Sequence, residues 1–142
     1  MAYWSYHTDM AEDRSRRFIK SGAPWEPLVG YSRAVRVGDF IAVSGSAPVS
    51  DDGELVGPGD PYAQAERCVE VIRNALQQAG AEMRHVVRTR MFVTDISLWE
   101  DFARAHHQGF GGSPPATSMV EVSRLIDPGM LIEIEADAIV DD

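Results

Sequence analysis

Three carboxylates alternate with apolar residues near the end of the chain, and they are the first candidates for chemistry. Glu133, Glu135 and Asp137 share one face if residues 130–140 form a strand, because successive side chains of a strand point to opposite faces. The other face is apolar and is expected to pack on the core. In water these groups are ordinary solvated carboxylates, but a partner subunit covering them would raise the pKa of at least one carboxyl group.

The other reactive residue types show no catalytic pattern. Cys68 lies within an apolar helical stripe, so a packed core thiol is expected rather than a nucleophile. His106 and His107 are adjacent and point in different directions, unlike the i, i+4 pair of a helical metal site. His7 and His85 have no recognisable partners in the sequence. No serine triad, zinc pattern or phosphate-binding glycine loop is present, so no metal site is predicted.

Composition limits the classes of function. The chain has 142 residues, 13 basic and 22 acidic, which gives a net charge of −9 and disfavours binding to nucleic acid. The short basic run at residues 14–17 is expected to be solvated. Because Cys68 is the single cysteine, no internal disulfide can form. No run of apolar residues suggests a membrane span or a signal peptide, so a cytoplasmic protein is predicted.

Periodicity predicts the elements that must position the candidate residues. Residues 31–37 and 40–44 alternate as a hairpin around Gly38-Asp39. Asp60 is predicted to cap a helix that Gly80 ends. A capping-box pattern, Ser97 to Glu100, is predicted to open a second helix. The remaining predicted elements are a turn at 22–26 and strands at 86–94, 116–122 and 130–140.

This order predicts an α+β fold with a mixed sheet and two helices packed on one face. The opposite face is too mixed for solvent alone, which indicates assembly. Residues 1–20 show no clear period and are predicted to form a partly flexible N-terminal extension, of which 1–13 are dispensable. Residues 21–142 are predicted to form a single domain.

A series of segments across residues 20–140, in order and with matching spacing, resembles the Rid/YjgF family. They are Tyr31-Ser-Arg-Ala-Val-Arg-Val-Gly-Asp39, Val43-Ser-Gly-Ser-Ala-Pro48, Tyr62-Ala-Gln-Ala65, Ala79-Gly-Ala81, Val87-Arg-Thr-Arg-Met-Phe-Val-Thr-Asp95, Pro115-Ala-Thr-Ser-Met-Val-Glu-Val122 and Leu131-Ile-Glu-Ile-Glu-Ala136. The resemblance implies a chorismate-mutase-like domain in a barrel-like homotrimer, with three small-molecule clefts between neighbouring subunits. It also implies hydrolysis of a 2-imino acid or its enamine, without a metal or organic cofactor.

The resemblance also implies which residues line the cleft. Glu133 is expected to hold or activate the attacking water, and Gly45 and Met119 to offer backbone groups. His106 corresponds approximately to an interface position, although a surface histidine at a helix end is the alternative. The expected substrate-binding residues are Tyr31, Ser44, Gly45, Thr117, Met119 and His106. Glu135 and Asp137 are expected to be structural or interfacial.

Thr117 is the departure from the family pattern. Deaminases of the family carry an arginine at this position, which binds the substrate carboxylate through two parallel hydrogen bonds. Threonine has one neutral hydroxyl and a shorter reach. Losing such charged hydrogen bonds costs about 1.5–3 kcal/mol each, so 2-imino acid deaminase activity is expected to be weak or absent.

Three functions therefore remain open from the sequence. The first is hydrolysis or tautomerisation of a small imine, enamine or related carbonyl compound with Glu133 as general base. The second is a module that binds a small metabolite without turnover. The third is an endoribonuclease, an activity attributed to some members of the family, which the acidic composition disfavours.

Overall fold

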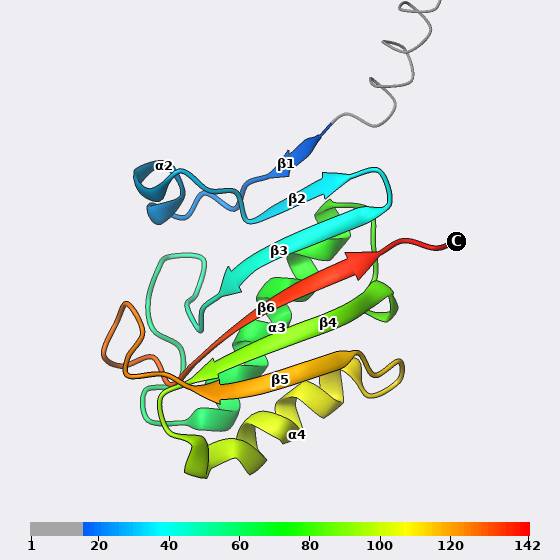
Figure 1. Ribbon diagram of the computed structural model, residues 1–142. Helices are drawn as coiled ribbons and strands as arrows, with labels where there is room; N and C mark the ends of the chain where they lie inside the picture. The colour runs from blue at the N-terminus through cyan, green and yellow to red at the C-terminus, as the bar shows by residue number, and fades with distance from the viewer. Residues whose placement is uncertain (1–15) are drawn as a thin grey trace, which may run out of the picture.

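The computed structural model describes residues 16–142, and they form a six-stranded mixed sheet with helices on one face (Figure 1). The strand order is β1-β2-β3-β6-β4-β5, and only β4 and β5 run parallel. The prediction that residues 1–13 are dispensable falls outside the described residues. The strands are β1 (Arg17–Ile19), β2 (Ala34–Val37), β3 (Phe40–Ser46), β4 (Val86–Val93), β5 (Ala116–Glu121) and β6 (Ile132–Ile139).

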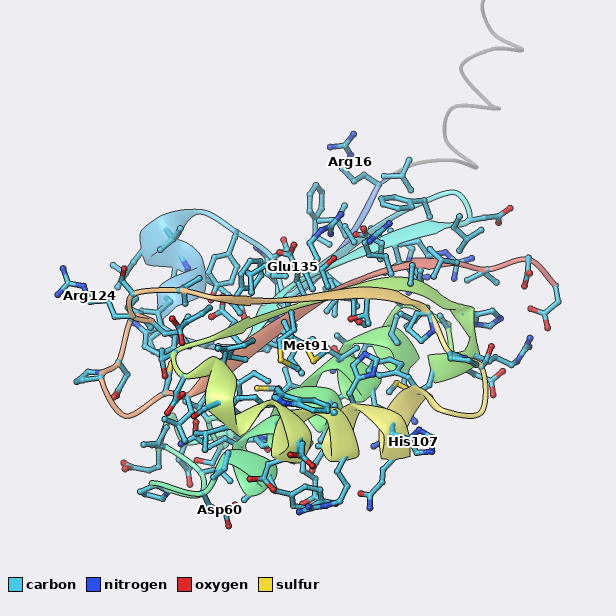
Figure 2. The ribbon with its side chains drawn as sticks, turned by 60° about the horizontal axis from the view of Figure 1, so that its bottom comes forward. Arg16, Asp60, Met91, His107, Arg124 and Glu135 are labelled. Atoms are coloured by element: carbon cyan, nitrogen blue, oxygen red, sulfur yellow. The ribbon has the colours of Figure 1, made fainter. Side chains whose placement is uncertain are left out.

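Two long helices, α3 (Pro61–Gln78) and α4 (Trp99–Phe110), cover the same face of the sheet (Figures 1 and 2). The core lies between these layers, where Ile72 and Leu76 of α3 and Ile134 of β6 are fully buried. The predicted α+β fold with a mixed sheet and helices on one face is confirmed. Figure 2 separates the layers: Met91 lies between sheet and helices, and Glu135 lies on the far side of the sheet.

The strongest sequence signals match the structure. The hairpin of β2 and β3 turns at Gly38, whose φ of 60° suits glycine. Asp60 caps α3 by accepting a hydrogen bond from the Ala63 N–H at 3.0 Å, and Pro61 is the first helical residue. In β6 the even-numbered residues are buried and Glu133, Glu135 and Asp137 face away from the helices, as the alternation predicts.

Three local features differ from the predictions. β1 was missed, and it brings part of the segment predicted as an N-terminal extension into the sheet. The turn predicted at 22–26 leads directly into a short helix, α2 (Trp25–Val29), which overlaps its last two residues. The predicted capping box was wrong: Asp95 accepts from the Ser97 N–H, and residues 96–98 form a 3-10 turn, η2 (Ile96–Leu98), before α4 starts at Trp99.

The face of the sheet away from the helices remains uncovered in the described chain and carries exposed apolar side chains. They include Phe18, Phe40, Val120 and Ile139. Exposed apolar side chains on an uncovered sheet face favour burial against another protein surface. No helix within residues 16–142 has the length and apolar character needed to cross a membrane. A further 3-10 turn, η1 (Met83–His85), leads into β4.

Candidate functional site

A cavity of about 1110 Å³ lies where β3 ends and β6 begins, between α2 and the loop at residues 122–131. It brings together four of the predicted site residues, which come from three segments of the chain. We call it the Glu133 groove. Among its lining residues are Tyr31, Arg33, Ser44, Gly45, Glu133 and Glu135.

Glycine is required at position 45 by the position of the Glu133 carboxylate. The pairing of β3 with β6 shifts register between Val43 and Ser46, and Gly45 lies within this irregularity. A β-carbon on residue 45 would overlap the Glu133 carboxylate. The absence of a side chain therefore lets this carboxylate lie against the backbone of β3.

Glu133 differs electrostatically from the other two carboxylates on its face. Burial raises the pKa of Glu133; nearby Arg33 opposes this shift, and Glu135 adds to it. Glu135 and Asp137 each contact Arg90 Nη1 at 3.3 Å. No ion pair is found for Glu133 among residues 16–142. A half-buried, unpaired carboxylate with a raised pKa is suited to accept a proton near neutral pH.

Arg33 is a cation of the groove that was not among the predicted site residues. Its residue is 8% exposed, and its Nη2 donates to the Gly45 carbonyl at 2.5 Å while its Nε lacks a partner. Burial lowers the pKa of Arg33, but an arginine of this kind stays charged at neutral pH. Arg33 thus fixes the peptide beside Glu133. Sequence alone could not find this contact, because Arg33 precedes β2 and its burial depends on tertiary packing.

The other three predicted site residues, His106, Thr117 and Met119, lie around a second, smaller cavity of about 370 Å³ between α4 and β5. We call it the Thr117 pocket. A hydrogen-bonded chain runs along it: His106 Nε2 lies 2.8 Å from Thr89 Oγ1, and Thr89 Oγ1 donates to Thr117 Oγ1 at 2.7 Å. Thr89 is fully buried and was not singled out by the sequence.

The imidazole of His106 is held in a largely apolar setting. Its ring centroid lies 4.6 Å from that of Phe110. Burial lowers the pKa of His106, and His107 lowers it further. The imidazole is therefore neutral at pH 7, and none of the described residues that line the Thr117 pocket is a lysine or arginine able to bind a carboxylate.

The Glu133 and Thr117 side chains lie on opposite faces of the sheet in one chain. β4 pairs with both β5 and β6, so faces can be followed across the sheet. Thr117 pairs with the buried Thr89, on the helix side, whereas Glu133 pairs with Phe92, on the open side. Within one chain, the sheet therefore separates the two halves of the predicted site.

One group of residues in the described chain has the spacing of a metal site: His85, Asp141 and Asp142. The Glu82 N–H donates to His85 Nδ1 at 3.0 Å, so the neutral ring carries its proton on Nε2, which contacts Asp142 at 2.8 Å. No lone pair of His85 is left for a metal. The contacts give this histidine, for which the sequence suggested no partner, a structural role.

Comparisons with known proteins agree with the fold. A family model described as Endoribonuclease L-PSP matches residues 21–140. A RutC family protein of Pyrococcus abyssi is 39% identical over 114 residues, covering 80% of this chain and 88% of that protein. Protein DfrA of Myxococcus xanthus is 36% identical over 130 residues, covering 88% and 96% respectively.

Comparison with solved structures gives the same result. A member of the YjgF/YER057c/UK114 family from Mycobacterium tuberculosis has a TM-score of 0.81 and 49% identity, covering 89% of this chain and all of that one. YyfA of Yersinia pestis, from the Rid protein family, has a TM-score of 0.79 and 32% identity, with 89% and 100% coverage. From the family model and these relatives together, the chain belongs to the Rid/YjgF family.

Proposed function

We propose that the protein acts on a small metabolite in a cleft between two copies of the chain. The Glu133 groove of one copy and the Thr117 pocket of the next would form its two halves. The main support for two copies is that Glu133 and Thr117 of one chain face opposite sides of the sheet. The uncovered apolar face, with exposed Phe18 and Phe40, supports burial against another copy. A homotrimer is proposed, and light scattering should give three times the chain mass of 15.6 kDa.

The reaction proposed for this cleft is hydrolysis of an imine or of the enamine with which it interconverts. Glu133 accepts a proton from water as the water oxygen attacks the carbon of the C=N bond. Glu133 returns this proton to the nitrogen, which gives a carbinolamine. It then transfers the proton of the carbinolamine hydroxyl to the amino group, so that the C–N bond breaks, a carbonyl forms and ammonia leaves. Water is consumed and ammonia released, with no change of oxidation state. The raised pKa of Glu133 suits this exchange, because a general base works best near the operating pH.

The substrate is proposed to lack a carboxylate at the Thr117 end. A carboxylate there would be removed from water beside a neutral hydroxyl and a neutral imidazole, and burying an uncompensated charge is strongly unfavourable. A misplacement of the substrate by about 1 Å costs roughly 100-fold in rate. Activity on 2-imino acids should therefore be weak.

The test compares 2-aminoacrylate with its neutral amide, both generated in situ, and follows release of ammonia. The amide should be hydrolysed faster than the background in a reaction that Glu133→Gln abolishes, while the acid should barely exceed background. Fast, Glu133-dependent hydrolysis of the acid would contradict the missing carboxylate site. Amide binding without acceleration would instead favour the non-catalytic binding module.

Endoribonuclease activity is the weaker alternative, and the description of the matching family model is what favours it. The net charge of −9 and the carboxylates on the open face oppose RNA binding. Incubation with a single-stranded RNA should leave the RNA intact. Cleavage that is lost in Glu133→Gln would replace the imine proposal.

A further inference from the structure

The Thr117 pocket has the composition of a site for an uncharged group. Its walls are apolar side chains from three elements: Met91 of β4, Phe110 of α4 and Met119 of β5, with Pro114 and Pro115 from the connection before β5. The side-chain polar atoms among its lining residues belong to His106, His107 and Thr117. Apolar walls with a few placed polar groups are typical of small-molecule sites.

Proton counting restricts how these polar groups can bind. The Thr89 hydroxyl has one proton and two close neighbours, His106 Nε2 at 2.8 Å and Thr117 Oγ1 at 2.7 Å. When Thr89 donates to Thr117, His106 must donate to Thr89. Thr117 then accepts from Thr89, and its own proton is free to point toward the exposed side of β5. When the hydrogen bonds run in the opposite direction, Thr117 donates to Thr89 and Thr89 donates to His106. Thr117 then offers a ligand only the lone pairs of its hydroxyl oxygen.

We propose that the Thr117 pocket binds the uncharged end of the ligand, a short apolar group that ends in a carbonyl or carboxamide oxygen. Thr117 donates the hydrogen bond to this oxygen. His106 acts as a positioning residue, because protonated His106 can only donate and therefore fixes Thr117 as a donor. This inference deepens the proposed function and rests on its placement of Thr117 in the ligand cleft.

The surroundings of His106 make the direction of the hydrogen bonds from His106 through Thr89 to Thr117 sensitive to pH. The titratable groups lining the pocket are His106 and His107. Arg104, on the same helix, is directed to the ring of Tyr62, with its guanidinium 4.2 Å from the ring centroid. Because burial and His107 lower the pKa of His106, protonation occurs only as the pH falls below the usual histidine range. A ligand that can only accept a hydrogen bond should bind more tightly at this lower pH.

The test uses two probes with the same number of non-hydrogen atoms, neutral 2-pentanone and anionic butyrate, and the assembled protein with ¹³C-labelled methionine methyl groups. Met91 and Met119 report on the pocket, and buried Met130, which does not line it, is the internal control. At pH 7, 2-pentanone should shift both reporter signals with an affinity about tenfold or more above that of butyrate, because a buried carboxylate needs a charged partner. The isosteric Thr117→Val should weaken 2-pentanone about two- to tenfold, the value of one hydrogen bond.

The role of His106 is read from the pH profile. Binding of 2-pentanone to the wild type should tighten as the pH falls through the pKa of His106, and His106→Gln should remove this dependence. Equal or stronger binding of butyrate at pH 7, an unchanged affinity in Thr117→Val, or a flat profile in the wild type would overturn the inference. These readouts do not involve turnover. Normal probe binding with no Glu133-dependent hydrolysis would therefore defeat the proposed hydrolysis and leave this inference intact.

Discussion

The Glu133 carboxylate lies against Gly45, so that any side chain at position 45 would occupy the place of the carboxylate. Gly45→Ala should therefore displace the flexible end of Glu133 while leaving the backbone nearly unchanged. We expect the Glu133-dependent reaction or ligand affinity to fall by about tenfold or more, as small misplacements in a site do. The melting temperature should fall by only a few degrees, equivalent to about 1 kcal/mol.

Gly112→Ala is the matched control for this substitution, because a β-carbon on residue 112 meets nothing within 4 Å. It should change neither activity nor stability. A Gly45→Ala variant with full Glu133-dependent activity would mean that the position of this carboxylate is not used.

Glu133→Gln should stabilise the protein at alkaline pH. The pKa of Glu133 is raised by burial in the folded chain. The free energy of unfolding therefore falls as the pH rises from the pKa of Glu133 in the unfolded chain through its higher pKa in the folded chain. No stability is lost at pH values below both. The melting temperature of Glu133→Gln should exceed that of the wild type at pH 8, and the difference should vanish near pH 4.

Glu100→Gln, on the exposed surface of α4, controls for the loss of one negative charge. A Glu133→Gln variant that is less stable than the wild type at pH 8 would show that the Glu133 carboxylate is stabilised by a partner, such as Arg33.

Cys68 should be unreactive in the folded protein. Its thiol is fully buried, its Sγ lies 3.7 Å from the Ile132 carbonyl, and burial raises the pKa of the thiol strongly. Since the thiolate is the reactive form, a thiol-specific reagent should label one group per chain only after unfolding in guanidinium. Rapid labelling without denaturant would contradict the packing of α3 on β6.

The elements predicted correctly are those whose signal is local and repeated. The alternation in β6 and the Asp60-Pro61 start of α3 each follow from a few adjacent residues. β1 has three residues, of which only Ile19 is buried, so its sequence shows no alternation. The capping-box prediction at Ser97 failed because its backbone N–H, which the Glu100 side chain would accept from in a capping box, donates instead to the Asp95 side chain.

The site was predictable only in part, for a similar reason. The alternation marked Glu133, Glu135 and Asp137 together, and the family resemblance singled out Glu133, Gly45 and Thr117. The contact of Arg33 with the Gly45 carbonyl and the link of Thr89 to His106 join residues far apart in sequence. Such contacts depend on the packing of whole elements, which no local pattern of residue types encodes.

Glu133 of one chain and Thr117 of another are proposed to line the same cleft. A chain carrying both Glu133→Cys and Thr117→Cys, treated with a short bis-maleimide, tests this directly, because buried Cys68 should not react. Each single variant serves as a control. We expect covalent dimers and trimers on a denaturing gel for the double variant, well above the level in the controls. A product of single-chain mass, linked internally or not at all, would contradict it.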